Sequence, residues 1–516
     1  MRLGFATIYS WRPHVEHTWF LARLAQQAGH ETRFLTCDGK LPTCYTRELR
    51  DRPKFVECLT CRLGNIQSYT NQGISRLSDF FSESSRPQEL TREWSFSSAS
   101  TLKRFESPED YKSDAFLKLV EKLEPSVRLA YLATRKWIEK EKIEALCLFN
   151  GRMDVTRGIY EAAQASNIPV VTHERSWFGD GIQLYPQVHC LSLKPVWEMV
   201  STWANKPLTR KQALAAARTG AKRFLKMNLT EWRAYHLNSQ SVSWPQSGPG
   251  PKVLILPSSS NEIWGHQDWS CQWPDILSGF EAVLDRLSPK SPNVVLRCHP
   301  NWGQNIGKQD GSHPERYYSQ WAVKKGIHCI GSKDNVDTLD LIAQADIVLV
   351  SVSSAALEAG LLGKQIITVS PSNYHTAGFT INAHTKENLE TMDSLKSREE
   401  VIRKTLRFVY TVSSRLPQYV DHVRAENAFG YKYFAGADPA RFMKLFTERS
   451  LRADDDQFCS GEKEEDSVIQ LLMEKKWKDV LNETTANKRE APDRVVRRPS
   501  YRWMDKLRSL APVGDR

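Results

Sequence analysis

Three short polar clusters in the second half of the chain each follow a run of apolar residues. They lie at Ser258–Glu262, Arg297–Asn301 and Ser351–Glu358. Arginine and histidine can neutralise a phosphate or pyrophosphate, and arginine does so through two parallel hydrogen bonds. A turn of serines ahead of a helix presents free backbone N–H groups to the same kind of anion. The residues that we assign to such an anion site are Ser258, Ser259, Glu262, Arg297, His299, Asn301, Ser353, Ser354 and Glu358.

The convergence of the three clusters carries this prediction, because each cluster alone would also fit an ordinary loop with capping serines. Short β-branched runs such as Ile347–Val350 are typical of parallel strands that are buried on both faces. The carboxyl ends of parallel strands meet at one edge of a sheet, where open α/β folds bind ligands. The sequence therefore predicts one crevice, with Glu358 one helical turn beyond Ser354 and placed to meet a sugar hydroxyl.

A second set of polar residues ends the apolar runs of the first half. His14, Glu16 and His17 follow the first run, at the start of an expected helix. A histidine–carboxylate set that faces a crevice can take a proton from a hydroxyl group, although Glu16 and His17 would equally suit an exposed helix start. Two later runs end in FNGR and THER, and these give five candidates for the opposite wall of the crevice: Asn150, Arg152, His173, Glu174 and Arg175.

Four of the ten cysteines have a spacing that suits a metal site. Cys37, Cys44, Cys58 and Cys61 follow the pattern C-x6-C-x13-C-x2-C inside one irregular insertion, residues 37–62. Four thiolates can hold a structural zinc ion or an iron–sulfur cluster. Free thiols are the alternative, and the long spacings leave it open.

The elements that would position these residues form two α/β halves. Strand, helix and strand alternate from Leu3 to Thr36, again around Ala145–Thr172, and again after Lys252. This pattern predicts two Rossmann-like domains that face a central crevice, 1–237 and 253–448, joined by a linker rich in Ser, Pro and Gly, 238–252. The first loop, SWRPH, lacks the glycine-rich dinucleotide fingerprint, so NAD is not expected there.

Charge and composition indicate which partners and which cellular compartment to expect. The 71 Lys and Arg against 60 Asp and Glu give a net charge of +11, which suits anionic partners. No apolar run approaches the ~20 residues of a membrane-spanning helix, and we see no signal peptide. We therefore expect a cytoplasmic protein whose cysteines are reduced or metal-bound.

The last segment, 449–516, reads as a charged, flexible tail. Its acidic triplet Asp454–Asp456 is expected to be a solvated charge run. A basic amphipathic helix near the end would let the protein lie peripherally on an anionic membrane, and a solvated tail is the alternative. The apolar face of that helix would hold Tyr501, Trp503, Met504, Leu507 and Leu510.

The motifs RCHPN and LIAQADIVLVSVSSAALEAGLLGKQIITVS resemble the nucleotide-sugar domain of GT-B glycosyltransferases. The bacterial capsule and surface polysaccharide biosynthesis group, with its Kdo-transferase-like enzymes, is the most similar, and RPHVEH, FNGR and THER support it across roughly residues 1–440. The resemblance implies a nucleotide-sugar substrate in the second half and a glycan or glycolipid acceptor in the first. It implies no catalytic divalent metal, in line with the lack of a DxD motif at a strand end, and no nucleic-acid partner is expected.

Under this resemblance, Arg297, His299 and the Ser353–Ser354 turn would stabilise the leaving nucleotide, and Glu358 would hold the ribose. His17, His14 or Glu16 would act as the base in an inverting reaction. Three alternatives stay open: a nucleotide-sugar epimerase, a CDP-polyol phosphotransferase, and a non-catalytic assembly protein of an envelope polysaccharide complex.

Overall fold

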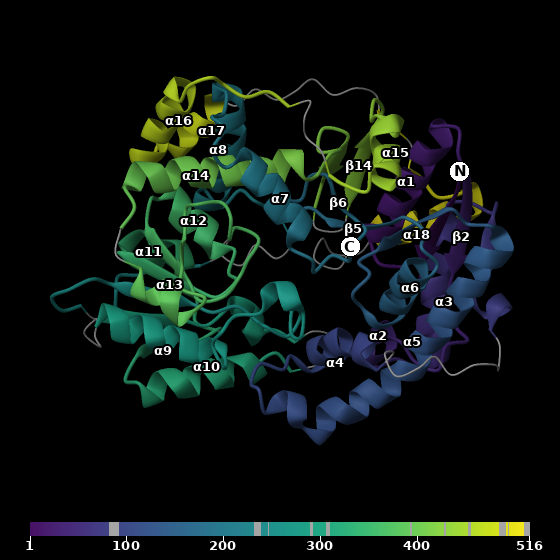
Figure 1. Cartoon of the computed structure of the whole chain (residues 1–516), viewed down its shortest axis with the longest axis horizontal. Coiled ribbons are helices and arrows are strands. Elements are labelled where there is room, and N and C mark those ends of the chain that lie inside the picture. Colours follow the sequence, from purple (N-terminus) through teal and green to yellow (C-terminus); the bar gives the residue numbers. More distant parts are fainter. Residues whose placement is uncertain are drawn as a thin grey trace.

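The structure is a computed structural model that contains two α/β domains lying side by side (Figure 1). In that view the N-terminal domain is purple to blue on the right, and the C-terminal domain is teal to green on the left. The residues that it describes are 1–81, 92–231, 239–245, 247–288, 293–305, 310–392, 395–427, 430–451, 456–483, 492–493 and 495–509.

The N-terminal domain is built on a six-stranded sheet of order β3-β2-β1-β4-β5-β6, in which β6 is antiparallel to β5 and the other pairs are parallel. Gly4 of β1 lets a helix lie close to the sheet, since a Cβ there would collide with Trp137 of α5. The bounds are β1 (Arg2–Thr7), β2 (Glu31–Thr36), β3 (Ile74–Arg76), β4 (Ala145–Phe149), β5 (Val170–Arg175), β6 (Ile182–Pro186), α1 (His14–Gln27), α5 (Asp114–Glu141) and α6 (Asp154–Ala165).

The C-terminal domain has an all-parallel sheet of order β12-β11-β10-β7-β8-β9. Its central strands are apolar and fully buried, as expected for strands covered on both faces. The bounds are β7 (Val253–Leu256), β8 (Val294–Arg297), β9 (His328–Ile330), β10 (Ile347–Val350), β11 (Gln365–Thr368), β12 (Ile381–Asn382), α9 (Ile276–Leu287), α10 (His313–Lys324), α11 (Thr338–Gln344), α12 (Ala355–Leu361), α13 (Lys386–Glu390) and α14 (Arg398–Tyr410).

The two sheets confirm the predicted pair of Rossmann-like domains, the organisation that the resemblance to GT-B enzymes implied. The domain limits differ from the predicted ones at both ends of the second domain. The helices α7 (Lys194–Trp203) and α8 (Arg210–Phe224), expected in the first domain, pack into the core of the second. Conversely, β13 (Val423–Ala425), β14 (Tyr431–Phe434) and α15 (Pro439–Thr447) return to the core of the first. Residues 238 and 246 of the predicted linker lie outside the described residues.

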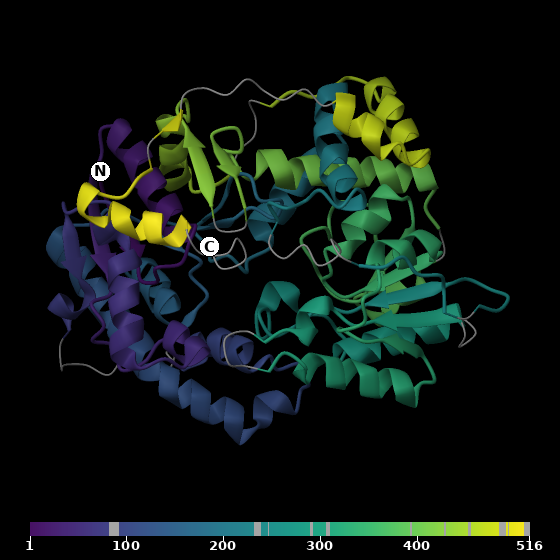
Figure 2. The same ribbon diagram turned by 180° about the vertical axis from the view of Figure 1, so that it is seen from behind.

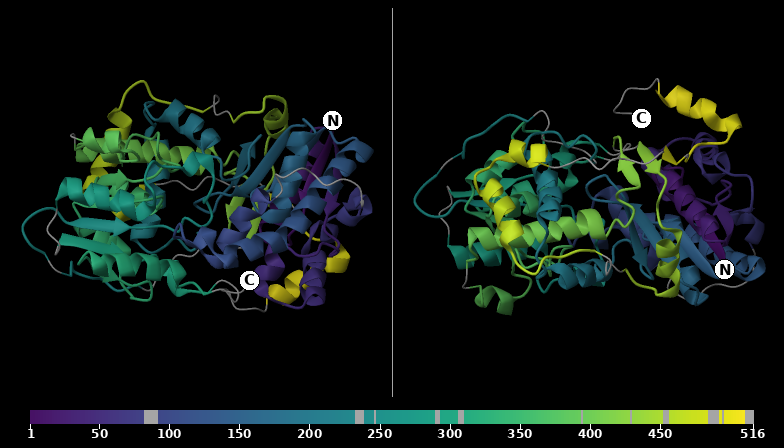
Figure 3. Two further views of the ribbon diagram at one scale, coloured as in Figure 1. Left: turned by 60° about the horizontal axis from the view of Figure 1, so that its bottom comes forward. Right: turned by 90° about the horizontal axis from the view of Figure 1, so that it is seen from above.

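The C-terminal stretch contains three helices instead of a plain tail. Helices α16 (Lys463–Met473) and α17 (Trp477–Glu483) pack on α8 of the second domain, while α18 (Arg502–Ser509) lies on the first domain, as Figures 2 and 3 show in yellow. Trp503 and Leu507 of α18 are exposed, and Asp505 pairs with Arg12 at 2.7 Å. Leu510 lies outside the described residues, so the membrane-binding face stays a prediction. In the ranges given above, no helix is long and apolar enough to cross a membrane.

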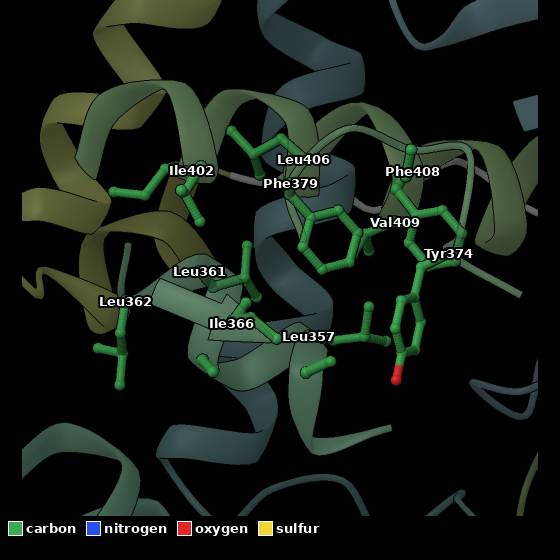
Figure 4. Packing of buried hydrophobic residues seen from close by; sticks show 14 of the residues in the cluster. Leu357, Leu361, Leu362, Ile366, Tyr374, Phe379, Ile402, Leu406, Phe408 and Val409 are labelled. Carbon is green, nitrogen blue, oxygen red and sulfur yellow. The ribbon is translucent and has the colours of Figure 1, made fainter. Parts of the chain in front are cut away.

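The short helix α12 is held by a dense apolar cluster. Figure 4 shows Ile402 and Leu406 of α14 next to Leu357 and Leu361 of α12. A Cβ at Gly360 would collide with the Thr405 side chain, so the glycine permits this close approach of α12 to α14. One face of α12 is packed in the core, so the opposite face of this helix points in a fixed direction.

The two domains also contact each other through the loop after β7 and the segment between α4 (Phe96–Lys103) and α5. The ring of Trp264 stacks on Tyr111 with centroids 3.8 Å apart. The Arg104 guanidinium donates to the backbone oxygen of Asn301 at 3.2 Å. Glu106, in the same segment, accepts the backbone N–H of Ser260 at 3.0 Å. Burial of Glu106 raises the pKa of its carboxyl to about 8.

This raised pKa predicts a pH-dependent stability. The folded protein holds the Glu106 proton more tightly than the unfolded chain, so the stabilisation is complete below the ordinary carboxyl pKa and is lost as pH rises towards 8. The loss amounts to about 5 kcal/mol at most. Glu106→Gln, which stays neutral, should therefore melt at a higher temperature than wild type at pH 8.5, with the difference shrinking towards pH 5.

Melting curves between pH 7 and 8.5 check this prediction, since the buried histidines are already neutral in that window. Glu109→Gln, an exposed neighbour, is the matched control. Parallel pH profiles for wild type and Glu106→Gln would show that Glu106 does not titrate there.

Candidate functional site

A cavity of about 920 Å³ lies at the carboxyl edge of the second sheet. Strand order reverses between β7 and β10, and such a reversal leaves a crevice because the connections diverge. The structure brings all three predicted clusters to this cavity. Seven of the nine predicted residues line it: Glu262, Arg297, His299, Asn301, Ser353, Ser354 and Glu358. What these residues bind stays a prediction.

The remaining two, Ser258 and Ser259, support the loop and do not belong to the cavity lining. The Ser258 backbone N–H donates to the Ser351 hydroxyl at 3.1 Å. The Ser259 hydroxyl accepts the indole N–H of Trp302 at 2.7 Å. Both serines therefore tie the ends of neighbouring strands together.

Glu358 has one engaged and one unengaged carboxylate oxygen. Its Oε1 accepts from Nη1 of Arg223 at 2.7 Å. Its Oε2 is buried and finds no hydrogen-bond donor among the described residues, although the side chain lines the cavity. A buried oxygen without a donor is costly. A ligand hydroxyl that donates to Oε2 would remove this cost.

Arg223 is the residue that orients Glu358. It lies on α8 between two carboxylates, Glu358 and Glu231, and its Nε and Nη2 both contact Glu231 at about 3 Å. Helix α8 comes this close to α12 because Gly220 has no side chain; a Cβ there would collide with Leu361. The close approach of the two helices thus sets the direction of the Glu358 carboxylate.

Arg297 lines the cavity, but its guanidinium already has hydrogen-bond partners within the protein. It is almost fully buried, and its Nη2 donates to the backbone oxygen of Asp334 at 3.1 Å, while Nη1 donates to that of Gly331. The guanidinium therefore shapes the loop that follows β9, which forms another wall of the cavity. Its contacts are neutral carbonyl groups, so its positive charge still acts on an anion in the cavity.

His299 and Asn301 lie in the turn that follows β8. The Nδ1 of His299 accepts the Asn301 backbone N–H at 3.1 Å, so a neutral ring carries its proton on Nε2. The side-chain oxygen of Asn301 accepts from Arg104 of the first domain at 3.2 Å. This second cluster therefore joins the cavity wall to the domain contact.

The serine turn is weaker as an anion site than the sequence suggests. Helix α12 has only seven residues, and no side chain of the described residues caps its start. The Ser353 hydroxyl accepts the backbone N–H of Ala355 at 3.3 Å, whereas Ser354 is exposed. The hydroxyls are close to the cavity, but a helix this short adds little of the expected dipole.

The candidates of the first domain gather at the carboxyl ends of β4 and β5. The Asn150 amide donates to Glu174 at 3.1 Å, and Nε2 of His14 lies 3.5 Å from the same carboxyl group. Burial raises the pKa of Glu174 and lowers the pKa of His14 well below its usual value, so His14 is neutral at pH 7. These residues do not line the large cavity. Arg152 is the link to it, 3.7 Å from Glu262.

His17 and Glu16 point into the protein and do not face a crevice. His17 is fully buried, with Nδ1 2.6 Å from the hydroxyl of Tyr433 on the returning strand β14. Glu16 accepts from Tyr69 at 2.8 Å. His173 is also fully buried, and its Nε2 lies 2.9 Å from the Thr18 hydroxyl. Their polar contacts are therefore internal. Of the three predicted base candidates, His14 remains beside the strand ends.

Several parts of the cavity wall were not predicted from the sequence. The turn after β9 could have been found from the sequence, because the segment GSKDN follows a strand end, as the three predicted clusters do. Trp177, Arg223 and Glu231 gave no such signal, since they come from loops and a helix outside the second sheet. The missed residues include Trp177, Arg223, Glu231 and the loop residues Ser332, Lys333, Asp334, Asn335 and Val336.

No protein-family model and no curated protein matches the sequence. Similar solved structures include two from Thermosulfurimonas dismutans. The KpsC beta Kdo 2,4 transferase is 12% identical over 60% of this chain and 88% of its own, with a TM-score of 0.32. The KpsC beta Kdo 2,7 transferase is 12% identical over 67% and 89%, with a TM-score of 0.33.

The UDP-GlcNAc 2-epimerase of Methanocaldococcus jannaschii, solved with UDP-GlcNAc and UDP, is 11% identical over 87% of this chain and 100% of its own. Its TM-score is 0.28. Likenesses this distant carry no argument about activity, so function must be argued from the residues of the cavity.

Proposed function

We propose that the protein is a glycosyltransferase that moves a sugar from a nucleotide-activated donor to a glycan or glycolipid of a bacterial surface polysaccharide. The observation that carries the proposal is the cavity at the strand-order reversal of the second sheet, with the unengaged Oε2 of Glu358 in its wall. A sugar hydroxyl supplies the donor that this oxygen lacks, and a cavity of this size suits a nucleotide-sugar.

The cavity wall offers partners for each part of such a donor. Glu358 would accept hydrogen bonds from the ribose hydroxyls. The backbone groups of the loop after β9 would meet the base. Lys333, His299 and the charge of Arg297 would stabilise the phosphates, and Ser353 and Ser354 also line the cavity. Since Arg297 already binds two carbonyl groups, its contribution is a fixed charge and a fixed loop.

The first domain would then hold the acceptor beside His14 and Glu174. In an inverting transfer the acceptor oxygen forms a bond to the anomeric carbon, the bond from that carbon to the phosphate breaks, and the acceptor proton leaves to a base. A neutral His14 imidazole, 3.5 Å from the Glu174 carboxylate, can take this proton. The developing charge on the nucleotide is met by the cations of the cavity.

The test uses the full chain with a panel of UDP-, GDP-, CMP- and CDP-sugars, with and without glycan or glycolipid acceptors. One donor class should raise the melting temperature, since a ligand at 100 times its dissociation constant adds about 2.7 kcal/mol of stability. Release of the nucleotide should then require an acceptor. Conversion of the donor sugar without acceptor would instead identify an epimerase, and transfer of a polyol phosphate would identify the phosphotransferase.

His14→Gln should lower acceptor-dependent nucleotide release by about 100-fold, within the range for loss of a general base, and leave the donor-induced shift intact. Failure of every nucleotide-sugar to bind would overturn the proposal and leave the non-catalytic alternative.

A further inference from the structure

Helix α3 (Lys54–Gly64) presents an apolar face to solvent. Phe55 is 76% exposed, and Val56 and Leu59 are 43% and 41% exposed. Phe55 and Leu59 lie one turn apart on the same side of the helix, and Val56 is next to them. Single apolar residues at a surface are common, but a contiguous apolar patch on one helix usually marks an interaction site.

The opposite face of α3 is fixed in the first domain, so the apolar patch points outward in the folded chain. Glu57 is buried and pairs with Arg50 at 2.7 Å. Gly39, in the loop that follows β2, has φ of +87°, and a Cβ on it would lie 3.1 Å from the Cβ of Cys58. The loop therefore packs closely on the inner face of α3.

The four cysteines that were predicted to bind a metal lie at this inner face. Cys37, Cys44, Cys58 and Cys61 line a cavity of about 30 Å³. The described part of the chain contains no group of three or more His, Cys, Asp or Glu side chains that could hold one metal ion, so the predicted metal site finds no support there. Burial raises the pKa of Cys44 to about 12 and also raises the pKa of Cys37, so both thiols are neutral packing groups.

Exposed cations flank the apolar patch of α3. Arg52 and Lys54 lie at the start of the helix, and Arg62 lies about one turn beyond Leu59. All three are exposed, and no ion pair with another described residue engages them. Apolar side chains bordered by Lys and Arg are typical of helices that lie in the interface of an anionic membrane.

Helix α18 repeats this arrangement. Trp503 and Leu507 are 49% and 59% exposed, and each lies two positions from Asp505. Asp505 pairs with Arg12 of the first domain at 2.7 Å. Two positions correspond to about 200° around a helix axis, so the two apolar side chains lie on the side opposite to this ion pair. The docked α18 therefore also has an outward apolar face.

Hydrogen bonds hold the segment before α18 next to the end of α3. The backbone N–H of Arg498 donates to the backbone oxygen of Ser68 at 2.8 Å, and its guanidinium donates to that of Gln67 at 2.8 Å. Gln67 and Ser68 come just after α3, and Figure 2 shows α18 in yellow across the purple part of the first domain. Exposed Arg502 and Lys506 add positive charge to this second helix.

We propose that α3 and α18 together form a surface that binds an anionic lipid membrane. The apolar side chains would enter the boundary between headgroups and acyl chains, while the neighbouring Arg and Lys side chains would meet the anionic headgroups. A lipid surface suits both features at once, since its interface is apolar below and, with anionic lipids, negatively charged above. The inserted residues would be Phe55, Val56, Leu59, Trp503 and Leu507.

The experiment mixes the full chain with sucrose-loaded vesicles and sediments them. Vesicles of phosphatidylcholine with phosphatidylglycerol should bind the protein, and vesicles of phosphatidylcholine alone should bind it much less. Binding should weaken when the salt concentration rises from about 0.1 M to about 1 M, because the charges are then screened. The mixture contains no nucleotide-sugar and no glycolipid, so the result is independent of the proposed transfer reaction.

Two double variants test the two helices separately. Phe55→Ser/Leu59→Ser and Trp503→Ser/Leu507→Ser should each weaken binding to the anionic vesicles by at least about 10-fold, because each removes two apolar side chains from the lipid contact. The melting temperature should stay unchanged, since these side chains are exposed in the folded chain. Val323→Ser, at a residue that is 75% exposed on α10 of the second domain, is the matched control and should bind like wild type.

Wild-type binding in either double variant would overturn the two-helix surface, and so would equal binding to neutral and anionic vesicles. Size-exclusion chromatography without lipid tests the competing occupant, a second copy of the chain. A wild-type dimer that becomes a monomer in Phe55→Ser/Leu59→Ser would assign the patch to that contact and overturn the membrane proposal. A monomer in both cases, together with the loss of vesicle binding, supports the membrane surface.

Discussion

Glu358→Ala is expected to weaken donor binding by about 10- to 100-fold while leaving the fold intact. The lost interaction is a hydrogen bond to a charged oxygen, worth about 1.5–3 kcal/mol. The fold should survive because Arg223 keeps its two contacts with Glu231 when Glu358 is removed. Titration calorimetry with the donor class found in the screen measures the change directly.

Two further variants are needed to interpret this result. Glu358→Gln keeps the size of the side chain but removes its charge, so it should also bind the donor weakly if the ribose needs a carboxylate. Glu390→Ala, an exposed glutamate on α13 of the same domain, should bind like wild type. Unchanged donor affinity in Glu358→Ala, with an unaltered melting temperature, would show that this carboxylate does not contact the ligand.

The parts of the site that could be predicted from the sequence are those that come directly after the ends of strands. An apolar β-branched run such as Ile347–Val350 fixes a buried strand, and the residues after it must then lie at the carboxyl edge of the sheet. This argument needs no knowledge of distant contacts. It placed Glu358 and His299 at the cavity because strand and turn lie within a few residues of each other.

Other parts depend on contacts between distant segments, which a local pattern does not encode. Arg223 reaches Glu358 across 135 residues, through the close packing of α8 on α12. His17 is covered by Tyr433, 416 residues later, when the chain returns to the first domain. From the sequence alone, both residues belong to amphipathic helices whose partners are unknown.

The charged run near the C-terminus also shows that a local sequence pattern does not identify which residue contributes to stability. The run EKEEDS favours a solvated surface, and three of its acids are indeed exposed or half exposed. The fourth acid of the run, Glu465, is only 1% exposed. It accepts from Nε and Nη2 of Arg407 at 2.9 and 2.7 Å, and from the backbone N–H of Leu208. The packing of the helices, and not the charge pattern of the run, decides which acid is buried in an ion pair.

Glu465→Ala is therefore expected to destabilise the second domain by about 3–5 kcal/mol, the usual cost of leaving one partner of a buried ion pair alone. Arg407 is 2% exposed and would keep its charge with, among the described residues, only the half-exposed Glu462 as a close ion-pair partner. Urea unfolding followed by tryptophan fluorescence reports the change, and the transition of the second domain should move to lower urea. Glu474→Ala is the control, since its pair with Lys476 is exposed and screened by solvent.

The double variant Arg407→Leu/Glu465→Leu separates two causes of this loss. If the cost comes from an unpaired buried charge, removing both partners should be less harmful than removing one, because no charge is then left in the core. If the double variant is as unstable as the sum of the singles, the two side chains contribute separately through packing. An unfolding transition of Glu465→Ala that matches wild type would mean that α16 does not dock on α8 and α14 in solution, and the stretch after residue 449 would then be the flexible tail that its charges suggest.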